Sequence, residues 1–416
     1  MRIAIIGGGI SGMTVAHLLC KDHRVTLFEA DRRIGGHTHT VSVTAEDGRR
    51  HAVDTGFIVF NEATYPNFIR LMRHLGVAWQ PSDMSFSVQC ERSGLLYSPK
   101  SLKALFVQRK NLLRPAFQRM LFDALRFRQA ARRLMASGDD RTTLGHYLRS
   151  NRYGPLFIEK FLVPMGSAIW SSDPRRFLDF PVSYLARFFH NHGFLNALHQ
   201  PRWLAIQGGS HRYIPPLTGP YRERIRLDSP VTAVRRASDG VDITVSDHPP
   251  ERFDQVVIAA HSDQALRMLA DPSDAERAVL GAIPYQENLT VLHTDARLLP
   301  PAPIARASWN YHIPVAPMGR VALTYYMNRL QQLDASEHYC VTLNRPEAVA
   351  PERRIASMLY HHPIYDPPGL QARRQWESIS GRNRTHYCGA YWGYGFHEDG
   401  VNSALAVANH FGKALP

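Results

Sequence analysis

The chain has 416 residues, of which 44% are hydrophobic and 20% charged, a balance typical of a folded globular protein with room for two domains. Its formal net charge is +13, so we expect an anionic partner such as a nucleic acid, a membrane surface or an acidic substrate. No nucleic-acid motif accompanies the charge, which disfavours nucleic acid, and no apolar run approaches the ~20 residues that span a bilayer.

The cysteines and histidines indicate a reduced compartment and no metal. The N-terminus enters a strand-like run at once, so we expect no signal peptide. The four cysteines show no C-x-x-C spacing, and the protein is therefore expected in the cytoplasm. The pairs His37-x-His39 and His361-His362 lack the spacing of a familiar metal site. We expect hydrogen-bonded or solvated histidines.

The first thirty residues carry the pattern of a dinucleotide-binding βαβ unit. An apolar run over 2–6 predicts a buried parallel strand, and residues 7–12 fit G-x-G-x-x-G. A helical pattern over 13–20 and a second strand-like run over 25–28 follow. Glu29, at the end of that run, is placed to accept hydrogen bonds from ribose hydroxyls.

Each residue of the glycine-rich turn has a physical role in this motif. Gly7 permits the tight turn, Gly9 lets the backbone approach a pyrophosphate, and Gly12 lets helix and strand pack closely. Ile10 and Ser11 begin the helix, where unpaired N–H groups and the positive end of the dipole favour phosphate. The turn therefore predicts a dinucleotide site.

The residues after Glu29 indicate which dinucleotide binds. This segment resembles the pattern E-A-x-x-R-x-G-G-R of the flavin amine oxidase, protoporphyrinogen oxidase and phytoene desaturase superfamily, with His37 in place of the final arginine. NAD enzymes of the Rossmann type do not ordinarily carry this second glycine pair. The resemblance implies FAD, bound non-covalently. The contacts it implies here come from Glu29, Ala30, Arg33, Gly35, Gly36, His37 and Thr38.

A predicted hairpin and helix follow. Strand-like runs at 41–44 and 50–53 flank a turn at 47–48. In the resembled superfamily the next segment, a D-x-G pattern, approaches the flavin ring, which implies contacts from Gly56 and Phe57. The alternative is an ordinary turn glycine. Residues 64–76 predict a helix, with Thr64 as its cap.

Residues 100–133 carry ten Lys or Arg side chains and a single acid, Asp123. Leu, Phe and Met side chains recur among them at helical spacing, which predicts a basic amphipathic helix. Such a helix can lie on anionic lipid, where each basic group contributes up to ~1 kcal/mol. Alternatively, it packs one face on the core and exposes the other to solvent. The first alternative predicts peripheral contact with the cytoplasmic face of a membrane.

The middle of the chain predicts a substrate domain and the return of the cofactor domain. The helical, aromatic pattern over 153–198 is expected to form core more than ligand contacts. The run 225–234 resembles the superfamily strand whose valine, here Val231, holds the adenine through its backbone, and the run 253–260 predicts a buried strand. A sheet in the substrate domain is predicted from strand-like runs at 289–292, 320–326 and 339–343.

The C-terminal segment 387–404 resembles the superfamily's last flavin segment, in which a glycine-rich strand end leads into a helix beside the isoalloxazine. The resemblance implies cofactor contacts from Gly389, Glu398, Gly400 and Val401. A helix that begins near Gly400 would direct N–H groups at the charge developing on the flavin. Preorganised donors of this kind can contribute ~2.7–4 kcal/mol.

Together these segments predict an α/β protein with a Rossmann-like FAD-binding domain of the GR2 type and an inserted, mixed α+β substrate domain. The FAD-binding domain is expected over 1–60, 200–265 and 385–416, and the substrate domain over 61–199 and 266–384. Only one G-x-G-x-x-G occurs in the chain, so no second dinucleotide domain for NAD(P)H is expected.

The expected activity is that of an FAD-dependent oxidoreductase, in which the protein positions the substrate against the cofactor. Many amine oxidases of the superfamily use a lysine of the substrate domain, but no lysine occurs here from Phe161 to Gly412, and Phe396 replaces an aromatic-cage tyrosine. These differences favour hydride removal from an apolar substrate, by desaturation or oxidation of a (modified) fatty acyl chain of a lipid. No catalytic residue is identified.

Three alternatives remain open: a flavin amine oxidase, a redox-neutral double-bond isomerase, and a flavin-binding module without turnover. The overall pattern is most similar to a bacterial branch of the superfamily whose genes tend to lie near those of cyclopropane-type fatty-acid synthases. That similarity implies a lipid or another small molecule as the substrate.

Overall fold

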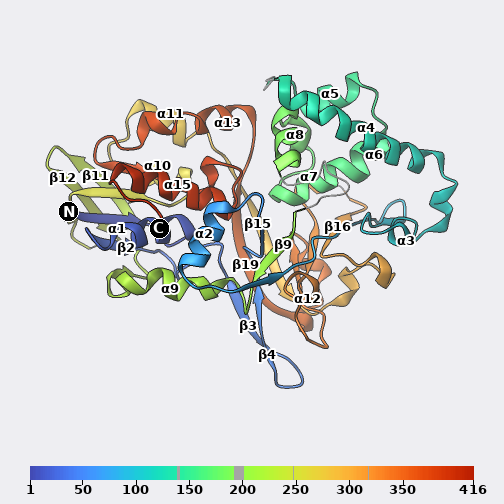
Figure 1. Cartoon of the computed structure of the whole chain (residues 1–416), viewed down its shortest axis with the longest axis horizontal. Helices are drawn as coiled ribbons and strands as arrows, with labels where there is room; N and C mark the ends of the chain where they lie inside the picture. Colours follow the sequence, from blue (N-terminus) through green and yellow to red (C-terminus); the bar gives the residue numbers. More distant parts are fainter. Residues whose placement is uncertain (138–140, 192–200, 247, 317) are drawn as a thin grey trace.

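The computed structural model describes residues 1–137, 141–191, 201–246, 248–316 and 318–416. Two bodies lie along the long axis in Figure 1: one holds both termini around a parallel sheet, and the other joins a helical layer to a mixed sheet. Residues 192–200, which the predicted aromatic region and the predicted domain limits include, lie outside the described part.

A five-stranded parallel sheet in the order β10-β2-β1-β14-β20 forms the centre of the first body. Parallel strands are buried on both faces, and their side chains accordingly divide between two cores: Ile3 and Ile5 point to one side, Ala4 and Ile6 to the other. The strands are β1 (Arg2–Ile6), β2 (Arg24–Phe28), β10 (Ile225–Arg226), β14 (Gln255–Ile258) and β20 (Thr385–Tyr387).

Helices α1 (Ile10–Leu19) and α15 (His397–His410) cover one face of this sheet. They approach closely at Gly400, where a Cβ would lie 2.8 Å from Ile10 Cγ2 and 3.0 Å from Ser11 Oγ. A three-stranded antiparallel sheet and two helices cover the other face. These elements are β11 (Val231–Ala237), β12 (Gly240–Val245), β13 (Glu251–Phe253), α10 (Ser262–Met268) and α11 (Asp274–Leu280).

A seven-stranded sheet in the order β19-β15-β18-β17-β16-β7-β8 forms the second body; all its pairs are antiparallel except β16–β7. Its strands are β7 (Phe86–Cys90), β8 (Leu95–Tyr97), β15 (Tyr285–His293), β16 (Trp309–Ile313), β17 (Leu323–Tyr326), β18 (Cys340–Leu343) and β19 (Arg354–Pro363).

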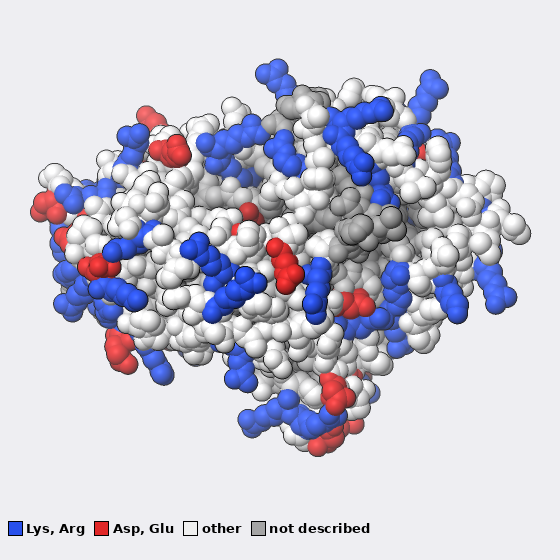
Figure 2. Space-filling model, in the orientation of Figure 1, with Lys and Arg blue, Asp and Glu red and all other residues white. Residues whose placement is uncertain are grey.

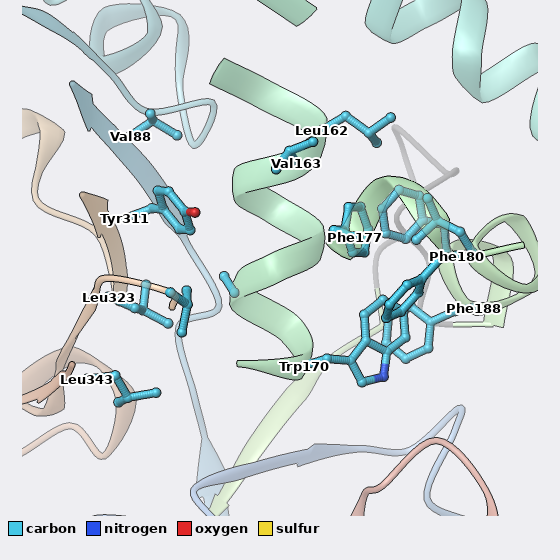
Figure 3. Close-up of a cluster of buried hydrophobic side chains, with 14 of the residues drawn as sticks. Val88, Leu162, Val163, Trp170, Phe177, Phe180, Phe188, Tyr311, Leu323 and Leu343 are labelled. Atoms are coloured by element: carbon cyan, nitrogen blue, oxygen red, sulfur yellow. The ribbon is translucent and has the colours of Figure 1, made fainter. Parts of the chain in front are cut away.

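The helical layer lies on this sheet (Figure 1). Its helices are α3 (Leu102–Leu105), α4 (Pro115–Ser137), α5 (Leu144–Ser150), α6 (Pro155–Phe157), α7 (Val163–Trp170) and α8 (Val182–Asn191), with a π-helical turn over Ile158–Leu162 between α6 and α7. Figure 3 shows α7 between two groups of side chains. Val88, Tyr311 and Leu323 come from the sheet, and Phe177 and Phe188 from the helical layer.

Small elements join the two bodies. The hairpin β3 (Thr40–Thr44)–β4 (Arg50–Asp54) is followed by a three-stranded sheet in the order β5-β9-β6. The strands of this sheet are β5 (Val59–Asn61), β6 (Trp79–Pro81) and β9 (Trp203–Ile206). Five further α-helices pack against the cores of the two bodies: α2 (Pro66–His74), α9 (Ile214–Thr218), α12 (Met327–Leu330), α13 (Pro367–Arg373) and α14 (Trp376–Ile379).

The predicted α/β class is confirmed, and so are the first strand, helix and second strand and the hairpin at 41–53. The run 225–234 was predicted as one strand, which is wrong. The chain turns at Asp228 (φ 47°), so β10 and β11 belong to different sheets. The run 253–260 is likewise divided, at Asp254, whose carboxylate accepts a hydrogen bond from Arg2 N (2.6 Å).

Two predicted helix ends also differ. Thr64 does not cap α2: its hydroxyl donates to Asn61 Oδ1 (3.1 Å). The carboxylate of Glu398 takes that place, accepting hydrogen bonds from the backbone of Asn67 (3.1 Å) and Phe68 (2.8 Å). The C-terminal helix begins at His397, three residues before Gly400. No described helix combines the length and apolar character needed to cross a bilayer.

A buried ionic cluster joins α11, β11 and β20. Glu276 Oε1 accepts hydrogen bonds from Arg236 Nη1 (2.6 Å) and Tyr387 OH (2.6 Å), and Oε2 accepts one from Ser273 N (2.8 Å). The Arg236 and Glu276 side chains are 4% and 3% exposed. Burial alone would raise the pKa of Glu276, but hydrogen bonds from Arg236, Tyr387 and Ser273 outweigh it, so the pKa lies below 4.5.

We predict that Glu276→Gln lowers the free energy of unfolding by about 2–3 kcal/mol at neutral pH, because it weakens hydrogen bonds between charged groups. A lowered carboxyl pKa stabilises the fold fully above 4.5, and that stability is lost as the pH falls through the folded value. The difference between variant and wild type should therefore shrink below pH 4.5. Urea denaturation at neutral pH and below pH 4.5 measures this difference in unfolding free energy. Glu377→Gln, at an exposed position, is the control. A pH-independent difference would contradict the prediction.

Candidate active site

A cavity of about 700 Å³ extends from the carboxyl ends of β1, β2 and β14 to the helical layer. Ligands of open parallel sheets bind beyond the carboxyl ends of the strands. Residues from both bodies line the cavity, among them Gly9 and Glu29 of the first and Trp170 and Trp309 of the second. It is therefore placed to hold a cofactor at one end and a substrate at the other.

The glycine-rich turn between β1 and α1 forms one end of the cavity. Gly7 has φ 106°, and a Cβ there would lie 2.7 Å from Ala259 O; a Cβ at Gly12 would overlap the carbonyl of Gly7. Packing of the chain itself thus requires both glycines. Gly9 differs, because a Cβ there would meet no described atom within 4 Å and would instead project into the cavity. The backbone at Gly9 is open to a bound group.

The first turn of α1 faces the same space. Its N-cap is Gly9, which has no side chain to cap the helix, and its first turn contains no acidic residue. Ile10 and Ser11 both line the cavity. A helix start with free N–H groups and no neighbouring carboxylate favours an anion, so this end of the cavity fits a pyrophosphate.

Glu29 stands beside the turn, at the end of β2. Its Oε2 accepts a hydrogen bond from Gly8 N (2.7 Å), and its Oε1 accepts one from Asp31 N (2.9 Å). An ionised carboxylate has about four acceptor sites, so two backbone bonds fix its position and leave further sites for hydroxyl groups. Glu29 lines the cavity, as a ribose-binding residue should.

Histidines form much of the middle wall. Burial lowers the pKa of His261 and His362 to about 4 and that of His397 to about 3, while burial and the neighbouring histidines hold the pKa of His37 well below its usual range. These four imidazoles are therefore neutral at physiological pH. Nε2 of His37 has no hydrogen-bond partner among the described residues, which leaves it available to a group in the cavity. The described residues include no cluster of three or more His, Cys, Asp or Glu suited to a metal.

His397 connects the start of α15 to the predicted flavin segments. Its ring stacks on Phe57 with the centroids 3.6 Å apart, and its Nε2 lies 3.0 Å from Thr38 Oγ1 and 3.2 Å from Tyr213 OH. Gly56 is also required here, because a Cβ would overlap the carbonyl oxygen of His37. These contacts hold the Gly36–Thr38 loop, the Gly56–Phe57 turn and α15 together.

The far end of the cavity is aromatic and aliphatic. Trp309 and Tyr325 are cross-strand partners with ring centroids 5.0 Å apart, and Trp170 donates through Nε1 to Tyr394 O (3.2 Å). Among the described lining residues Glu29 is the single acid, and none is a lysine. The apolar part of the lining comprises Ile58, Val59, Met84, Ile169, Trp170, Phe188, Trp203, Trp309, Tyr325, Tyr365, Tyr394 and Phe396.

The structure brings most of the residues expected at the cofactor to this one cavity. Those that line it are Gly7, Gly9, Ile10, Ser11, Glu29, Ala30, Gly35, Gly36, His37, Gly56, Phe57, Val231 and Gly389. The others lie behind the wall. Gly12 and Gly400 serve helix packing, Glu398 caps α2, and Val401 is fully buried. Arg33 donates to the carbonyls of Gly36 (2.8 Å) and Thr38 (3.2 Å), and Thr38 bonds to Tyr213 and His397.

Sequence reasoning missed the apolar end. Ile169, Trp170 and Phe188 lie in the region expected to form core, and they do belong to or pack against the core cluster, but all three also line the cavity. Trp309, in a segment to which the sequence assigned no chemistry, also does so. The signal was the aromatic alternation of the strand containing Trp309, but the partner that completes the wall, Tyr325, is distant in sequence.

A parallel sheet whose glycine-rich turn opens on a cavity is the arrangement of a dinucleotide-binding protein. The chain belongs to the family of flavin containing amine oxidoreductases, whose pattern matches residues 10–294. It is accordingly an FAD-dependent oxidoreductase, as the sequence predicted. No curated protein matches the chain.

Several solved structures share the fold over almost the whole chain. Cyclohexylamine oxidase from Brevibacterium oxydans is 16% identical, with a TM-score of 0.68 and 99% of each chain covered. Putrescine oxidase bound to putrescine is 13% identical, with a TM-score of 0.68 and the same coverage. A CLA-producing fatty acid isomerase from P. acnes is 16% identical, with a TM-score of 0.66, covering 99% of this chain and 98% of its own. At these identities the likeness shows the fold.

We predict that Glu29→Ala weakens FAD binding roughly ten- to a hundred-fold, because hydrogen bonds to a charged acceptor contribute ~1.5–3 kcal/mol. Quenching of flavin fluorescence during titration of the apoprotein gives the dissociation constant. Asp31→Ala is the matched control, since Asp31 is exposed and does not line the cavity. An unchanged constant for Glu29→Ala, or an equal loss in the control, would remove Glu29 from the cofactor site.

Proposed function

We propose that the protein removes a hydride from an apolar substrate and thereby desaturates or oxidises a (modified) fatty acyl chain of a lipid. The observation that carries the proposal is the chemistry of the far end of the cavity. Apart from Ser171, the described residues there are aromatic and aliphatic, and the neighbouring His362 and His397 are neutral. Burying each CH₂ of a substrate chain contributes ~0.8 kcal/mol, so such a chamber favours an alkyl chain.

The same chamber disfavours a charged amine. The described lining has one acid, Glu29, and it lies at the glycine-rich turn rather than at the apolar end. Placing an ammonium group among apolar side chains without a counter-charge costs several kcal/mol. The absence of lysine between Phe161 and Gly412 adds to this difference from many amine oxidases of the superfamily.

We assign the cofactor to the rest of the cavity. Gly9, Ile10 and Ser11 would hold the pyrophosphate and Glu29 the ribose, with Val231 beside the adenine. The flavin would lie against Gly56, Phe57 and Gly389. When bound, FAD supplies the hydride acceptor. The six predicted contact residues behind the wall would act by positioning it: Gly12, Arg33, Thr38, Glu398, Gly400 and Val401.

We assign the donors that the sequence predicts near Gly400 to the start of α15. Because the helix begins at His397 and His397 lines the cavity, we expect its first N–H groups, rather than those at 400–402, to face developing negative charge. The two carboxylates of this first turn accept hydrogen bonds from backbone N–H groups: Glu398 from Asn67 and Phe68, and Asp399 from Phe396. The Phe57–His397 stack holds this end of the helix in place through two rigid rings.

The substrate class also fits the resemblance to the bacterial branch whose genes tend to lie near those of cyclopropane-type fatty-acid synthases. One similar fold is a fatty acid isomerase, and an isomerase would use the same apolar chamber. An acyl chain carried by a phospholipid lies in a bilayer. We therefore place the protein at the cytoplasmic face of an anionic membrane, with residues 100–133 toward the lipid.

Anaerobic mixing of the holoenzyme with phospholipids, and separately with cyclohexylamine or putrescine, tests the proposal. We predict that the visible absorption of oxidised flavin bleaches with the phospholipid and not with either amine, and that the lipid product has lost two hydrogens by mass spectrometry. Bleaching by an amine alone would show an amine oxidase. A shifted double bond with the flavin still oxidised would show an isomerase. Either result would overturn the proposal.

A further inference from the structure

The outer face of α4 and the turn before it expose an apolar strip, defined as Leu112, Leu113, Phe122 and Leu125. Their side chains are 51%, 90%, 62% and 56% exposed. Eleven large hydrophobic side chains are exposed in the described part of the chain, and four of them lie within the fourteen residues from Leu112 to Leu125. Clustering of this kind on a folded protein marks an interaction surface.

The four side chains share one face. Phe122 and Leu125 are separated by three residues and therefore project from the same side of α4. Gln118 lies one turn before Phe122, and its Nε2 donates to the carbonyls of Asn111 (3.1 Å) and Leu112 (3.0 Å). These two hydrogen bonds hold the Leu112–Leu113 turn against the same face, so the strip is continuous.

The fold does not need the strip for its core. The opposite side of α4 is already packed: Phe117 is 0%, Met120 1% and Phe127 2% exposed. The sequence left two alternatives for this helix, membrane contact or packing on the core. The structure shows that α4 packs on the core and still presents apolar side chains outward.

Positive charge surrounds the strip. Arg109, Lys110 and Arg114 are exposed beside Leu112 and Leu113, and Arg132 and Arg133 are exposed farther along α4. Figure 2 shows Lys and Arg side chains standing out on the α3–α4 side of the molecule, with few acids among them. The single acid of the segment, Asp123, is 1% exposed and accepts a hydrogen bond from Gly154 N (2.7 Å), so it does not offset this charge at the surface.

Not every arginine of the segment serves the surface. Arg126 donates to Asn151 O (2.7 Å), lies 3.5 Å from Asp123 and stacks over Tyr153, with its guanidinium carbon 3.9 Å from the ring centroid. Arg119 donates to Arg152 O (3.0 Å). Replacing these two would disturb the fold, so they do not test surface charge.

We infer that the apolar strip and its basic border form a membrane-docking surface whose occupant is an anionic lipid bilayer. Apolar side chains surrounded by Lys and Arg are the pattern of interfacial helices, which bury their apolar face at the acyl boundary and hold anionic headgroups with the basic one. The position of α8, which packs against the buried side of α4, supports this docking surface. Phe127 contacts Phe189 of α8, with ring centroids 6.5 Å apart, and Phe188 of the same helix lines the cavity. One helix therefore separates the docking face from the apolar chamber.

This inference deepens the proposed function, which takes its acyl chain from a membrane, but its test is independent of turnover. The holoenzyme is sedimented with vesicles of phosphatidylcholine alone or mixed with phosphatidylglycerol, at low and high salt. We expect it to pellet with the anionic vesicles, to remain free with phosphatidylcholine, and to be partly released by salt as the Debye length shrinks from ~10 Å at 0.1 M to ~3 Å at 1 M.

The double variant Phe122→Gln/Leu125→Gln keeps every charge and should weaken binding to the anionic vesicles at least about tenfold, since two side chains no longer insert. Ile304→Gln/Leu359→Gln, which removes two exposed apolar side chains elsewhere, is the control and should bind as the wild type does. Equal thermal stability of the three proteins excludes a folding effect.

Three results would overturn the inference: wild type that does not pellet with anionic vesicles, a strip variant that binds as the wild type does, or an equal loss in the control. Light scattering without lipid adds a fourth. If the strip holds two copies together and vesicles do not separate them, the occupant is a second copy of the chain. We expect anaerobic bleaching of the flavin by a detergent-dispersed lipid to be the same in the strip variant as in the wild type, so failure of docking and failure of the proposed function are distinguished.

Discussion

The absence of a side chain at Gly12 is the constraint on which the rest of the structure depends. A Cβ there would overlap the carbonyl of Gly7, so a larger residue would push α1 away from the sheet. α15 rests on α1 at Gly400, and it carries both Glu398, which caps α2, and His397, which stacks on Phe57. One close approach thus fixes the cavity wall through a series of contacts.

The sequence could predict the elements that depend on residues close together in the chain, and not the contacts between residues far apart in it. The β1–α1–β2 unit and the β3–β4 hairpin depend on neighbouring residues, and their patterns are sufficient to identify them. The cap of α2 could not be predicted, because Glu398 lies far from Asn67 in sequence and a local rule sought it at Thr64. The apolar wall has the same origin: Trp170 on α7 and Trp309 on β16 are far apart in sequence and line one cavity only once the second body is folded, and buried aromatics look alike in sequence.

The cavity joins two environments that require different chemistry. At the glycine-rich turn, backbone N–H groups and one carboxylate supply directed polar contacts. At the other end, apolar side chains offer a surface for hydrophobic burial, which does not depend on direction. His261 and His362, which lie between them, lose their charge through burial, so these two side chains place no fixed charge between the two ends. A bound molecule is therefore oriented by its polar part and held by its apolar part.

The order of strands in the parallel sheet determines how long β1 stays unpaired on one side during synthesis. β1 lies between β2 and β14, and Ile3 pairs with Gln255. A ribosome adds ~5–20 residues per second, so β1 waits roughly 10–50 s for this partner. During that interval one side of β1 is an unpaired strand edge, the kind of surface that invites association with other chains. The nascent protein therefore needs its early edge shielded until the second half of the chain emerges.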